Sequence, residues 1–341
     1  MKTFSLPIAL MVCFRTWARL LLLALGLSAL AAPAMAQTKV VLVMTGSIND
    51  GGWNQLAYEG LVRVGKKAGY KTAYVENVSQ ARIDQVVRGY ADDGYDLVIG
   101  HGYEFGGAFL DIAPEFKKTK FFASTFKPQP TVPSNVQYAD LGYYDLGYAA
   151  GTLAALSSKS GKAVGFVGGG DNPTQQRWMR TFIAGAEAAV PGLKGLGVVT
   201  GDYDNAAKGR EAAQAMITSG ADVVFHSANV TGLGAIQGAA AKGVKVIGCY
   251  TDQTALAPKL MVSSFRIKLD SMVERVADWA HTGKFAGGTE WKPAVHEIWE
   301  PLYAGRPGSN ADLLTAAQTA KFQKVWDDLS TGKIKVSTLV K

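Results

Sequence analysis

Short apolar runs rich in Val and Ile alternate with longer stretches of helical periodicity along most of the chain. The runs that predict strands are 39–45, 70–77, 95–100, 120–125, 135–139, 162–168, 196–202, 221–227, 244–249 and 260–265. The stretches that predict helices are 54–68, 80–93, 105–118, 143–158, 175–190, 205–219, 231–242, 268–282 and 311–330. Most strand runs are continuously apolar, which is typical of parallel strands covered by helices on both faces. We therefore expect an α/β fold.

The alternation of strands and helices restarts near Lys162, and the predicted strands are too many for one small sheet. We therefore predict two Rossmann-like lobes with parallel sheets. The predicted first lobe comprises residues 37–139 and 252–290. The predicted second lobe comprises residues 140–251 and 291–341. No low-complexity linker separates the lobes, so we expect short crossovers that act as a hinge. A single doubly wound domain is the alternative.

The first 36 residues differ in character from the rest of the chain. Arg15 and Arg19 precede an apolar run at 20–32, which is followed by an Ala-x-Ala tripeptide ending at Ala36. These are the features of a secretory signal peptide, so we expect cleavage after Ala36 and a periplasmic protein. No cysteine stands at the cleavage point, and we therefore do not expect a lipoprotein.

The net charge excludes one class of partner. The whole chain carries a formal charge of +7, of which three basic residues lie in the predicted signal peptide, leaving +7 − 3 = +4. The remaining basic residues are scattered rather than clustered. A mild, dispersed charge is typical of a solvated surface, so we expect no nucleic-acid partner.

Signals for catalysis and for metal binding are weak in the sequence. The four histidines form no HExxH pattern, and Cys249 has no CxxC partner. The run 168–170 is Gly-Gly-Gly before a predicted helix, but it lacks the spacing and the lysine of a phosphate loop. We interpret it as a packing turn, and we predict no cofactor, no metal and no enzymatic activity.

Polar and aromatic residues recur just after the predicted strands. The candidate ligand-binding residues at these points are Asn49, Asp50, Trp53, Asn54, Tyr103, Asp140, Tyr203, Asn229, Tyr250 and Asp252. Further polar residues in similar positions are His101, Glu104, Asn172 and Asp204. In open α/β sheets, ligands bind at the carboxyl ends of the strands, and those ends face one cleft in a two-lobed protein. Acids and amides beside flat rings suit a small polar molecule with flat faces.

Simpler structural roles compete with these assignments. Asn49 and Asn229 can cap helices or form turns. Trp53 can fold back as core, although its glycine neighbours favour exposure, and Tyr103 can serve for packing alone. For Asp140 and Asp252, at the predicted crossovers, a ligand hydroxyl or amine explains a carboxylate better than packing does.

The order of these motifs resembles one protein family. The matching segments are 50–55, 147–151, 168–173, 203–213, 220–224 and 247–253, within a similarity that spans residues 39–303. The chain thus resembles the basic membrane protein family of ABC-transporter substrate-binding proteins, whose best-known members bind purine nucleosides. This resemblance implies a type I periplasmic binding fold and an inner-membrane ABC permease as partner.

The resemblance also implies roles for individual residues. Trp53 and Tyr203 stand where the family holds the purine between two rings, and Asn54 stands where it bonds the base. Two positions depart from the family pattern. Tyr250 replaces an acid that helps to hold the nucleoside. A lysine that is usual in the family is absent, and Arg266, which lies near its position, is the eleventh candidate ligand-binding residue. These departures favour a free nucleobase or related flat heterocycle over a nucleoside.

The sequence therefore predicts a periplasmic substrate-binding protein of an ABC importer, with a purine nucleobase or nucleoside in the cleft between two lobes. Two alternatives remain open at this point. One is a receptor for a sugar or another small molecule, because sugar receptors share this two-lobed fold. The other is a nucleoside-processing enzyme, such as a hydrolase that uses Asp50 or Asp140.

Overall fold

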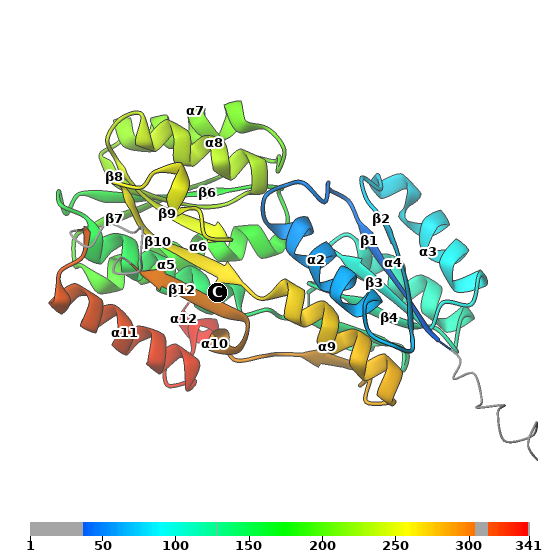
Figure 1. The fold of residues 1–341 in the computed structure, drawn as a ribbon. Helices are drawn as coiled ribbons and strands as arrows, with labels where there is room; N and C mark the ends of the chain where they lie inside the picture. Colours follow the sequence, from blue (N-terminus) through cyan, green and yellow to red (C-terminus); the bar gives the residue numbers. More distant parts are fainter. Residues whose placement is uncertain (1–36, 128, 304–312, 340–341) are drawn as a thin grey trace, which may run out of the picture. The chain divides into compact units, whose positions relative to one another are not determined.

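The structure is a computed structural model and describes residues 37–127, 129–303 and 313–339. The predicted signal peptide lies outside the described residues. Two six-stranded sheets form the framework, each covered by helices (Figure 1). The predicted α/β fold with two lobes of parallel sheet is confirmed. Within the described residues, no helix combines the length and the apolar character needed to cross a membrane.

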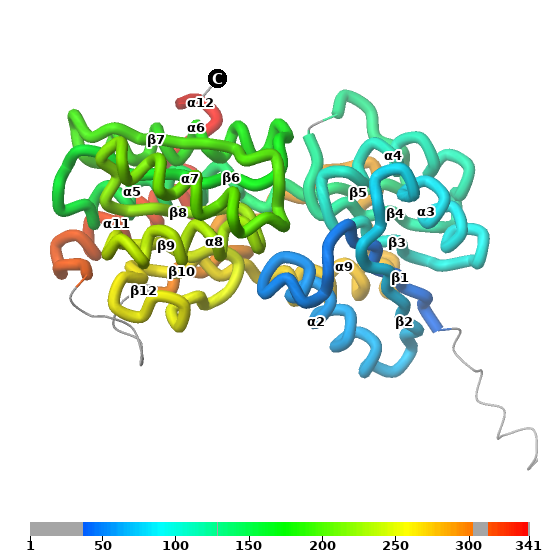
Figure 2. The backbone as a smooth tube through the Cα atoms, turned by 90° about the horizontal axis from the view of Figure 1, so that it is seen from above, coloured from blue at the N-terminus to red at the C-terminus, as the bar shows by residue number. Residues whose placement is uncertain are grey.

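The first sheet has the strand order β11-β5-β4-β3-β1-β2, and all its neighbouring strands are parallel. Its strands are β1 (Thr38–Met44), β2 (Tyr70–Val75), β3 (Leu97–His101), β4 (Lys120–Ala123), β5 (Val136–Ala139) and β11 (Thr289–Trp291). Its helices are α2 (Trp53–Gly65), α3 (Ile83–Asp92), α4 (Phe105–Ile112) and α9 (Leu269–Thr282). In Figure 2, α2 and α9 lie on one side of this sheet and α3 and α4 on the other. Helices on both faces explain why the strand Val40–Met44 is fully buried.

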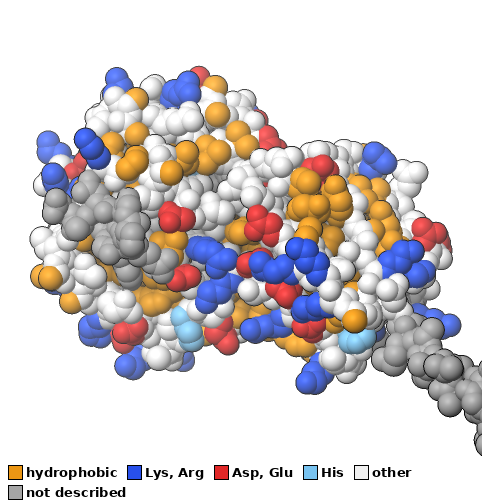
Figure 3. All heavy atoms as spheres, viewed as in Figure 1, with side chains coloured by type: hydrophobic (Ala, Val, Ile, Leu, Met, Phe, Trp, Pro, Cys, Tyr) orange, Lys and Arg blue, Asp and Glu red, His pale blue; other side chains and the backbone are white. Residues whose placement is uncertain are grey.

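Ion pairs hold α2 against α9. The Arg63 guanidinium lies 2.6 Å from the Asp270 carboxylate and 2.7 Å from the Glu274 carboxylate, and Lys67 lies 3.2 Å from Glu274. Figure 3 shows basic and acidic side chains intermingled on this face. The network matters for the site because α2 begins at Trp53.

The second sheet has the strand order β12-β10-β9-β8-β6-β7, and only the pairing of β10 with β12 is antiparallel. Its strands are β6 (Ala163–Gly168), β7 (Lys194–Val199), β8 (Ala221–Ser227), β9 (Lys245–Tyr250), β10 (Met261–Ile267) and β12 (Trp299–Tyr303). The helices around it are α5 (Tyr143–Ser157), α6 (Pro173–Ala189), α7 (Ala206–Thr218), α8 (Asn229–Ala240), α10 (Val295–Ile298), α11 (Ala316–Ser330) and α12 (Val336–Leu339). Figure 1 shows α7 and α8 on one side of the sheet and α5 and α11 on the other.

The strand β10 does not lie where the sequence analysis placed it. We assigned 252–290 to the first lobe, but β10 pairs with β9 in the second sheet, with Phe265 opposite Cys249. The reason is that β10 is another nearly fully buried strand, which completes the second sheet's apolar interior. The chain returns to the first lobe only with α9.

Three segments connect the lobes. The chain passes from β5 to α5, from β10 to α9, and from β11 to α10. Two of these crossings lie side by side, because the Asp140 amide donates to the Trp291 carbonyl at 2.9 Å. Short adjacent crossings are the arrangement expected of a hinge.

Candidate ligand-binding site

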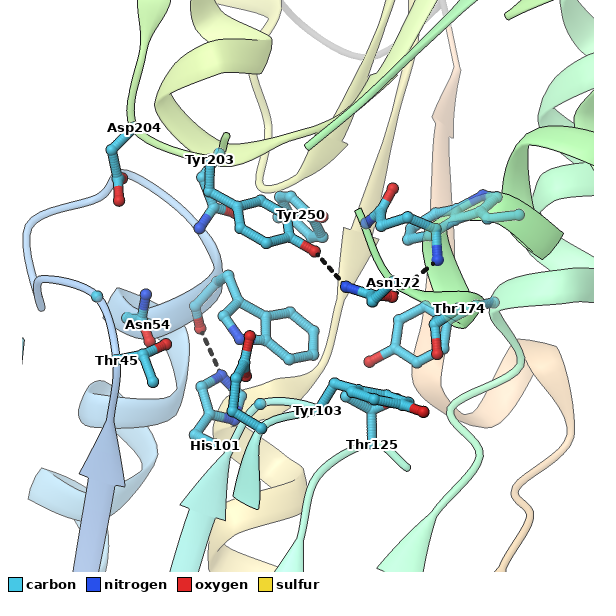
Figure 4. A pocket seen from close by; sticks show the side chains of 18 residues that line it. Thr45, Asn54, His101, Tyr103, Thr125, Asn172, Thr174, Tyr203, Asp204 and Tyr250 are labelled. Carbon is cyan, nitrogen blue, oxygen red and sulfur yellow. Dashed lines mark hydrogen bonds between the residues drawn. The ribbon is translucent and has the colours of Figure 1, made fainter. Parts of the chain in front are cut away.

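A cavity opens where the carboxyl ends of the two sheets meet (Figure 4). The residues that line it are Thr45, Gly46, Trp53, Asn54, His101, Gly102, Tyr103, Glu104, Thr125, Tyr143, Asn172, Thr174, Gln175, Trp178, Tyr203, Asp204, Asn229 and Tyr250. Its volume is about 100 Å³, whereas one buried water needs roughly 10–15 Å³. The space therefore exceeds a structural-water site, and both lobes contribute to its walls.

The loop between β1 and α2 is organised by Asp50. Its carboxylate accepts hydrogen bonds from the backbone N–H of Gly52 and Asn54, both at 2.9 Å, and of Gln55 at 3.2 Å. It also accepts from the Asn54 side-chain amide at 2.9 Å. A helix N-terminus leaves such N–H groups without partners and favours negative charge, so Asp50 caps α2. With its oxygens engaged, Asp50 is a poor general base.

The Asp50 contact also fixes the orientation of Asn54. A carboxylate only accepts, so the nitrogen of the Asn54 amide faces Asp50 and the oxygen faces away. That oxygen, Oδ1, is buried and has no hydrogen-bond partner. Asn54 therefore presents an unpaired acceptor in a residue that lines the cavity.

Trp53 is half-buried and stacks on His101. The ring centroids lie 4.3 Å apart with an interplanar angle of 17°. The Tyr143 ring is tilted against the indole with the ring centroids 6.2 Å apart, and the Tyr250 ring meets it edge-on with the centroids 5.8 Å apart. One face of the indole is thus occupied by the imidazole, and Trp53 both lines the cavity and packs against the hydrophobic core.

His101 is completely buried and is held neutral. Burial lowers its pKa to about 3, although a hydrogen bond to the Trp53 backbone opposes the shift. Its Nε2 lies 3.0 Å from the Trp53 carbonyl oxygen, which only accepts, so Nε2 carries the proton. Nδ1 is then a bare acceptor, and it has no partner.

Tyr203 lines the cavity from the second lobe and lies flat against a glycine run. A Cβ added to Gly170 would lie 2.5 Å from the Tyr203 ring, and one added to Gly169 would be closer still. The predicted packing turn at 168–170 therefore makes room for this ring. The Asn172 amide donates to Tyr203 Oη at 3.2 Å (Figure 4). Burial, together with the Glu104 carboxylate, raises the pKa of Tyr203 to about 12.

Tyr250 occupies a strained position at the end of β9. Its φ is +75°, a conformation that costs a non-glycine residue about 1–3 kcal/mol and is concentrated at functional sites. Its hydroxyl lies 3.1 Å from Ser227 Oγ, which accepts from the Gln175 amide at 3.0 Å. Burial raises the Tyr250 pKa well above its usual value. Tyr250 thus stays a neutral phenol in the wall of the cavity.

Three residues of the second lobe contact the β1–α2 loop. The Asn229 amide donates to Asp50 at 3.3 Å, and the Thr251 hydroxyl donates to the Gly51 carbonyl at 3.1 Å. Tyr250 packs so closely on Gly52 that an added Cβ would lie 3.2 Å away. The loop that carries Trp53 is therefore held by both lobes.

The cavity walls contain several buried polar atoms without partners. These atoms are Asn54 Oδ1, His101 Nδ1, Tyr143 Oη, Gln175 Oε1 and Trp178 Nε1. Leaving a buried polar atom unpaired costs about 1–3 kcal/mol. Their concentration around one space is the pattern expected where a ligand completes the hydrogen bonds.

The structure brings six of the eleven predicted site residues to the cavity. These six are Trp53, Asn54, Tyr103, Tyr203, Asn229 and Tyr250. The Tyr103 ring also packs on Phe126 at 5.3 Å, so packing and lining coexist there.

The other five predicted residues do not line the cavity. Asn49 is exposed, and Asp50 lies behind the wall as a cap. Asp140 accepts from the Gly142 N–H at 3.2 Å, and its carboxylate lies 3.9 Å from Lys292. Asp252 is exposed and accepts from the Thr254 N–H at 3.0 Å. Arg266 pairs with Asp270 at 3.1 Å on the first turn of α9.

Several lining residues were missed because they stand on helices rather than at strand ends. Tyr143 begins α5, and Gln175 and Trp178 lie one turn apart near the start of α6. The i, i+3 spacing of Gln175 and Trp178 just after a glycine turn was the sequence signal for them, because this spacing places both side chains on the same face of α6. The sequence analysis places His101, Glu104 and Asp204 at strand ends but assigns them no specific role in ligand binding.

No group of three or more His, Cys, Asp or Glu residues in the described parts of the chain could hold a metal ion. Cys249 is buried, and burial raises the pKa of its thiol well above the usual value.

A two-lobed α/β protein with a cavity at the strand ends of both sheets has the architecture of a solute receptor. Comparison with known proteins agrees with this assignment to the class of solute receptors. Residues 37–298 match the family model for PnrA-like ABC transporter substrate-binding proteins, termed Bmp, and the chain belongs to this family. The resemblance to the basic membrane protein family is confirmed.

Two relatives extend the comparison. The chain is 30% identical to the CD4+ T-cell-stimulating antigen of Listeria monocytogenes over 326 residues, covering 88% of this chain and 87% of that one. It is 31% identical to the ABC transporter nucleoside-binding protein BmpA of Lactococcus lactis over 266 residues, covering 71% and 74%.

A solved structure supports the fold. An ABC-transporter solute-binding protein of Aeropyrum pernix K1 superposes with a TM-score of 0.76 at 18% identity, covering 87% of this chain and 92% of that one. At this identity the likeness concerns the fold alone. The family consists of substrate-binding proteins of ABC transporters rather than enzymes.

Proposed function

We propose that the protein is a periplasmic receptor that binds a purine nucleobase, a nucleoside or a related flat heterocycle for an ABC importer. One observation carries this proposal. Aromatic rings from both lobes wall a cavity in which buried polar atoms lack partners. Flat faces with hydrogen-bonding edges are what a purine offers.

The energetics of stacking are adequate for such a ligand. Base–aromatic stacking contributes about 1–3 kcal/mol per base, and a micromolar affinity corresponds to about 8 kcal/mol. Trp53 and Tyr203 together could supply much of this, and Asn54 Oδ1 could accept a hydrogen bond from the ligand. The Lactococcus lactis relative, named as nucleoside-binding, supports the same ligand class.

The mechanism follows from the two lobes. Ligand contacts with both walls favour a closed arrangement in which the Thr251 and Asn229 hydrogen bonds to the β1–α2 loop form. The closed form then presents both lobes to the permease in the inner membrane. The ligand is released chemically unchanged, because the proposed function is transport rather than catalysis.

Identification of the bound molecule tests the proposal most directly. Mass spectrometry of small molecules released by denaturing the purified protein should detect a purine. Competition calorimetry with adenine, adenosine, guanosine and ribose should then show purine binding. Tight ribose binding without purine binding would support a sugar receptor, and conversion of a bound nucleoside would support an enzyme.

The wall role of Trp53 gives a residue-level prediction. Replacing Trp53 with Ala removes a stacking face and should weaken purine binding by about tenfold or more. Trp53→Phe should retain most of the affinity. Tyr74→Ala is a suitable control, because Tyr74 is 41% exposed on the edge strand β2 and does not line the cavity. Equal affinities of Trp53→Ala and Tyr74→Ala, measured by calorimetry, would rule out stacking on Trp53.

A further inference from the structure

Two carboxylates line the cavity, one from each lobe. Glu104 lies in the first lobe between β3 and α4, and Asp204 lies in the second between β7 and α7. Neither carboxylate forms an ion pair with the described residues. No Lys or Arg is among the lining residues, and His101 is neutral. The charged groups of the wall are therefore all negative.

The hydrogen-bonding groups of the wall are biased in the same direction. Asn54 Oδ1 and His101 Nδ1 are unpaired acceptors on side chains that are 3% and 0% exposed, and their roles follow from the chemistry of their fixed partners. Gln175 Oε1 is a third unpaired acceptor. Trp178 Nε1 is the one unpaired group among these lining atoms that can only donate. A ligand that satisfies this wall must donate more hydrogen bonds than it accepts.

The rings add a third contribution of the same sign. Aromatic faces carry negative electrostatic potential and attract cations. Trp53, Tyr103 and Tyr203 all line the cavity. Carboxylates, bare acceptors and ring faces thus together create a space that favours positive charge.

We infer that the cavity selects its ligand by charge: a positively charged purine-like ligand binds more tightly than its neutral counterpart, a negatively charged one is rejected, and Glu104 and Asp204 set this preference. This inference rests on the proposed function and adds a selection rule to it. The two carboxylates come from opposite lobes, so closing the lobes brings like charges to the same space. A cation between them relieves that repulsion, and an anion increases it.

The local surroundings disfavour any further negative charge in the cavity. Burial raises the pKa of Glu104, and burial together with the nearby carboxylates of Asp202 and Asp50 raises the pKa of Asp204. A cationic ligand beside either carboxylate favours its ionised form. Lys208, a basic side chain on the first turn of α7, is paired with Asp202 at 3.2 Å. The lining residues include no Lys or Arg that could compensate the two wall carboxylates.

Three ligands that differ only at the 5′ position test the inference. These are 5′-amino-5′-deoxyadenosine, adenosine and adenosine 5′-monophosphate, with calorimetry at pH 7 in low and high NaCl. We expect the amine to bind about fivefold or more tightly than adenosine, and the phosphate to bind at least about tenfold more weakly. Both differences should shrink in high salt.

Variants assign the effect to the two carboxylates. Glu104→Gln and Asp204→Asn should each lower the amine-to-adenosine affinity ratio, and the double variant should bring it near one. Glu59→Gln is a matched control, because Glu59 is an exposed carboxylate on α2 that does not line the cavity. Thermal melts verify that each variant is folded.

The outcomes separate this inference from the proposed function. Adenosine binding with equal affinities for all three ligands overturns the charge rule and leaves the proposed function standing. A charge preference that persists unchanged in the double variant overturns the assignment to Glu104 and Asp204. Failure of adenine and of every ligand in the series to bind overturns the proposed function, and the charge rule with it.

Discussion

Asp145, on the first turn of α5, is a carboxyl group that the fold holds against ionisation. Burial and the neighbouring charge of Asp140 raise its pKa to about 6, from an ordinary value of 3.8. The folded state therefore binds a proton more tightly than the unfolded state does. Its favourable contribution to stability is present below pH 3.8 and is lost as the pH rises through about 6.

Because of this shift, we expect the substitution Asp145→Asn to raise the free energy of unfolding by an amount that depends on pH. At pH 7 the variant should be more stable than the wild type by about 1–3 kcal/mol, because it removes a carboxylate that folding must desolvate. At pH 4 the difference should largely vanish, because the wild-type carboxyl is then protonated. Urea unfolding at both pH values measures this stability difference. An equal increase in stability at pH 4 and pH 7 would contradict its assignment to the raised pKa of Asp145.

At the residue scale, the sequence predicts where functional groups gather better than what each group does. Trp53 and Tyr203 could be placed in the wall because exposed rings at strand ends have few other roles. For Asp50, the sequence did not distinguish a helix cap from a ligand-binding residue. Its capping role depends on four hydrogen-bond donors whose positions only the folded loop defines. Arg266 was misjudged because its partner Asp270 lies on the next helix.

At the scale of elements, one glycine sets how closely two helices approach. A Cβ on Gly60 of α2 would lie 2.8 Å from the Asp270 Cα of α9, so the two helices pack backbone to backbone with no room for a methyl group. Gly89 of α3 has no atom within 4 Å of such a Cβ. The same substitution should therefore have opposite effects at the two positions.

The matched pair Gly60→Ala and Gly89→Ala tests this difference. Gly60→Ala should destabilise the protein by about 1–3 kcal/mol through overpacking of α2 against α9. Gly89→Ala should stabilise it by about 0.5–1 kcal/mol, because alanine loses less conformational freedom in a helix. Urea unfolding compares the two, and a Gly60→Ala protein as stable as the wild type would show that the helices adjust freely.

Among the elements, apolar strands and periodic helices were predictable, and strands without an apolar run were not. Each predicted strand and helix has a counterpart within a few residues of its expected position. The strands β11 and β12 were missed, because neither contains a continuous apolar run: β11 reads Thr-Glu-Trp, and β12 is interrupted by Glu300 and Pro301. The sheet to which β10 belongs depends on tertiary pairing, which periodicity does not encode.

At the scale of the whole molecule, the contacts between the lobes converge on one loop. Thr251 reaches from the second lobe to the carbonyl of Gly51, and a separation of the lobes would break this hydrogen bond. On the proposed closing mechanism, part of the free energy of closure then comes from the protein itself. A ligand needs to supply only the remainder.

Removing this hydrogen bond should weaken ligand binding without altering the cavity wall. Thr251→Val should reduce affinity by about two- to fivefold, since one such hydrogen bond contributes about 0.5–1.5 kcal/mol. Thr251→Ser keeps the hydroxyl and should bind as the wild type does. Calorimetry with the identified ligand compares the affinities of the Thr251→Val and Thr251→Ser variants. Small-angle scattering of the ligand-free variants compares how far their lobes are separated. Indistinguishable affinities would mean that the contact plays no part in closure.

The two-lobed plan was predictable because the strand–helix alternation restarts along the chain. The exact route between the lobes was not, since it depends on which sheet each late strand joins. The cavity was predictable in place, from the rule that ligands bind at strand ends, but its charge was not. That property arises only when Glu104 and Asp204 from different lobes face one space.

The stacked pair of Trp53 and His101 has a practical consequence. Indole fluorescence depends on what lies against the ring, and in this protein one face of the Trp53 indole is already against an imidazole while the side chain borders the cavity. A molecule that arrives in the cavity changes the surroundings of this fluorophore. The unlabelled protein can therefore serve as an optical sensor of its ligand, and Trp53→Phe separates the Trp53 signal from that of Trp178, which also lines the cavity.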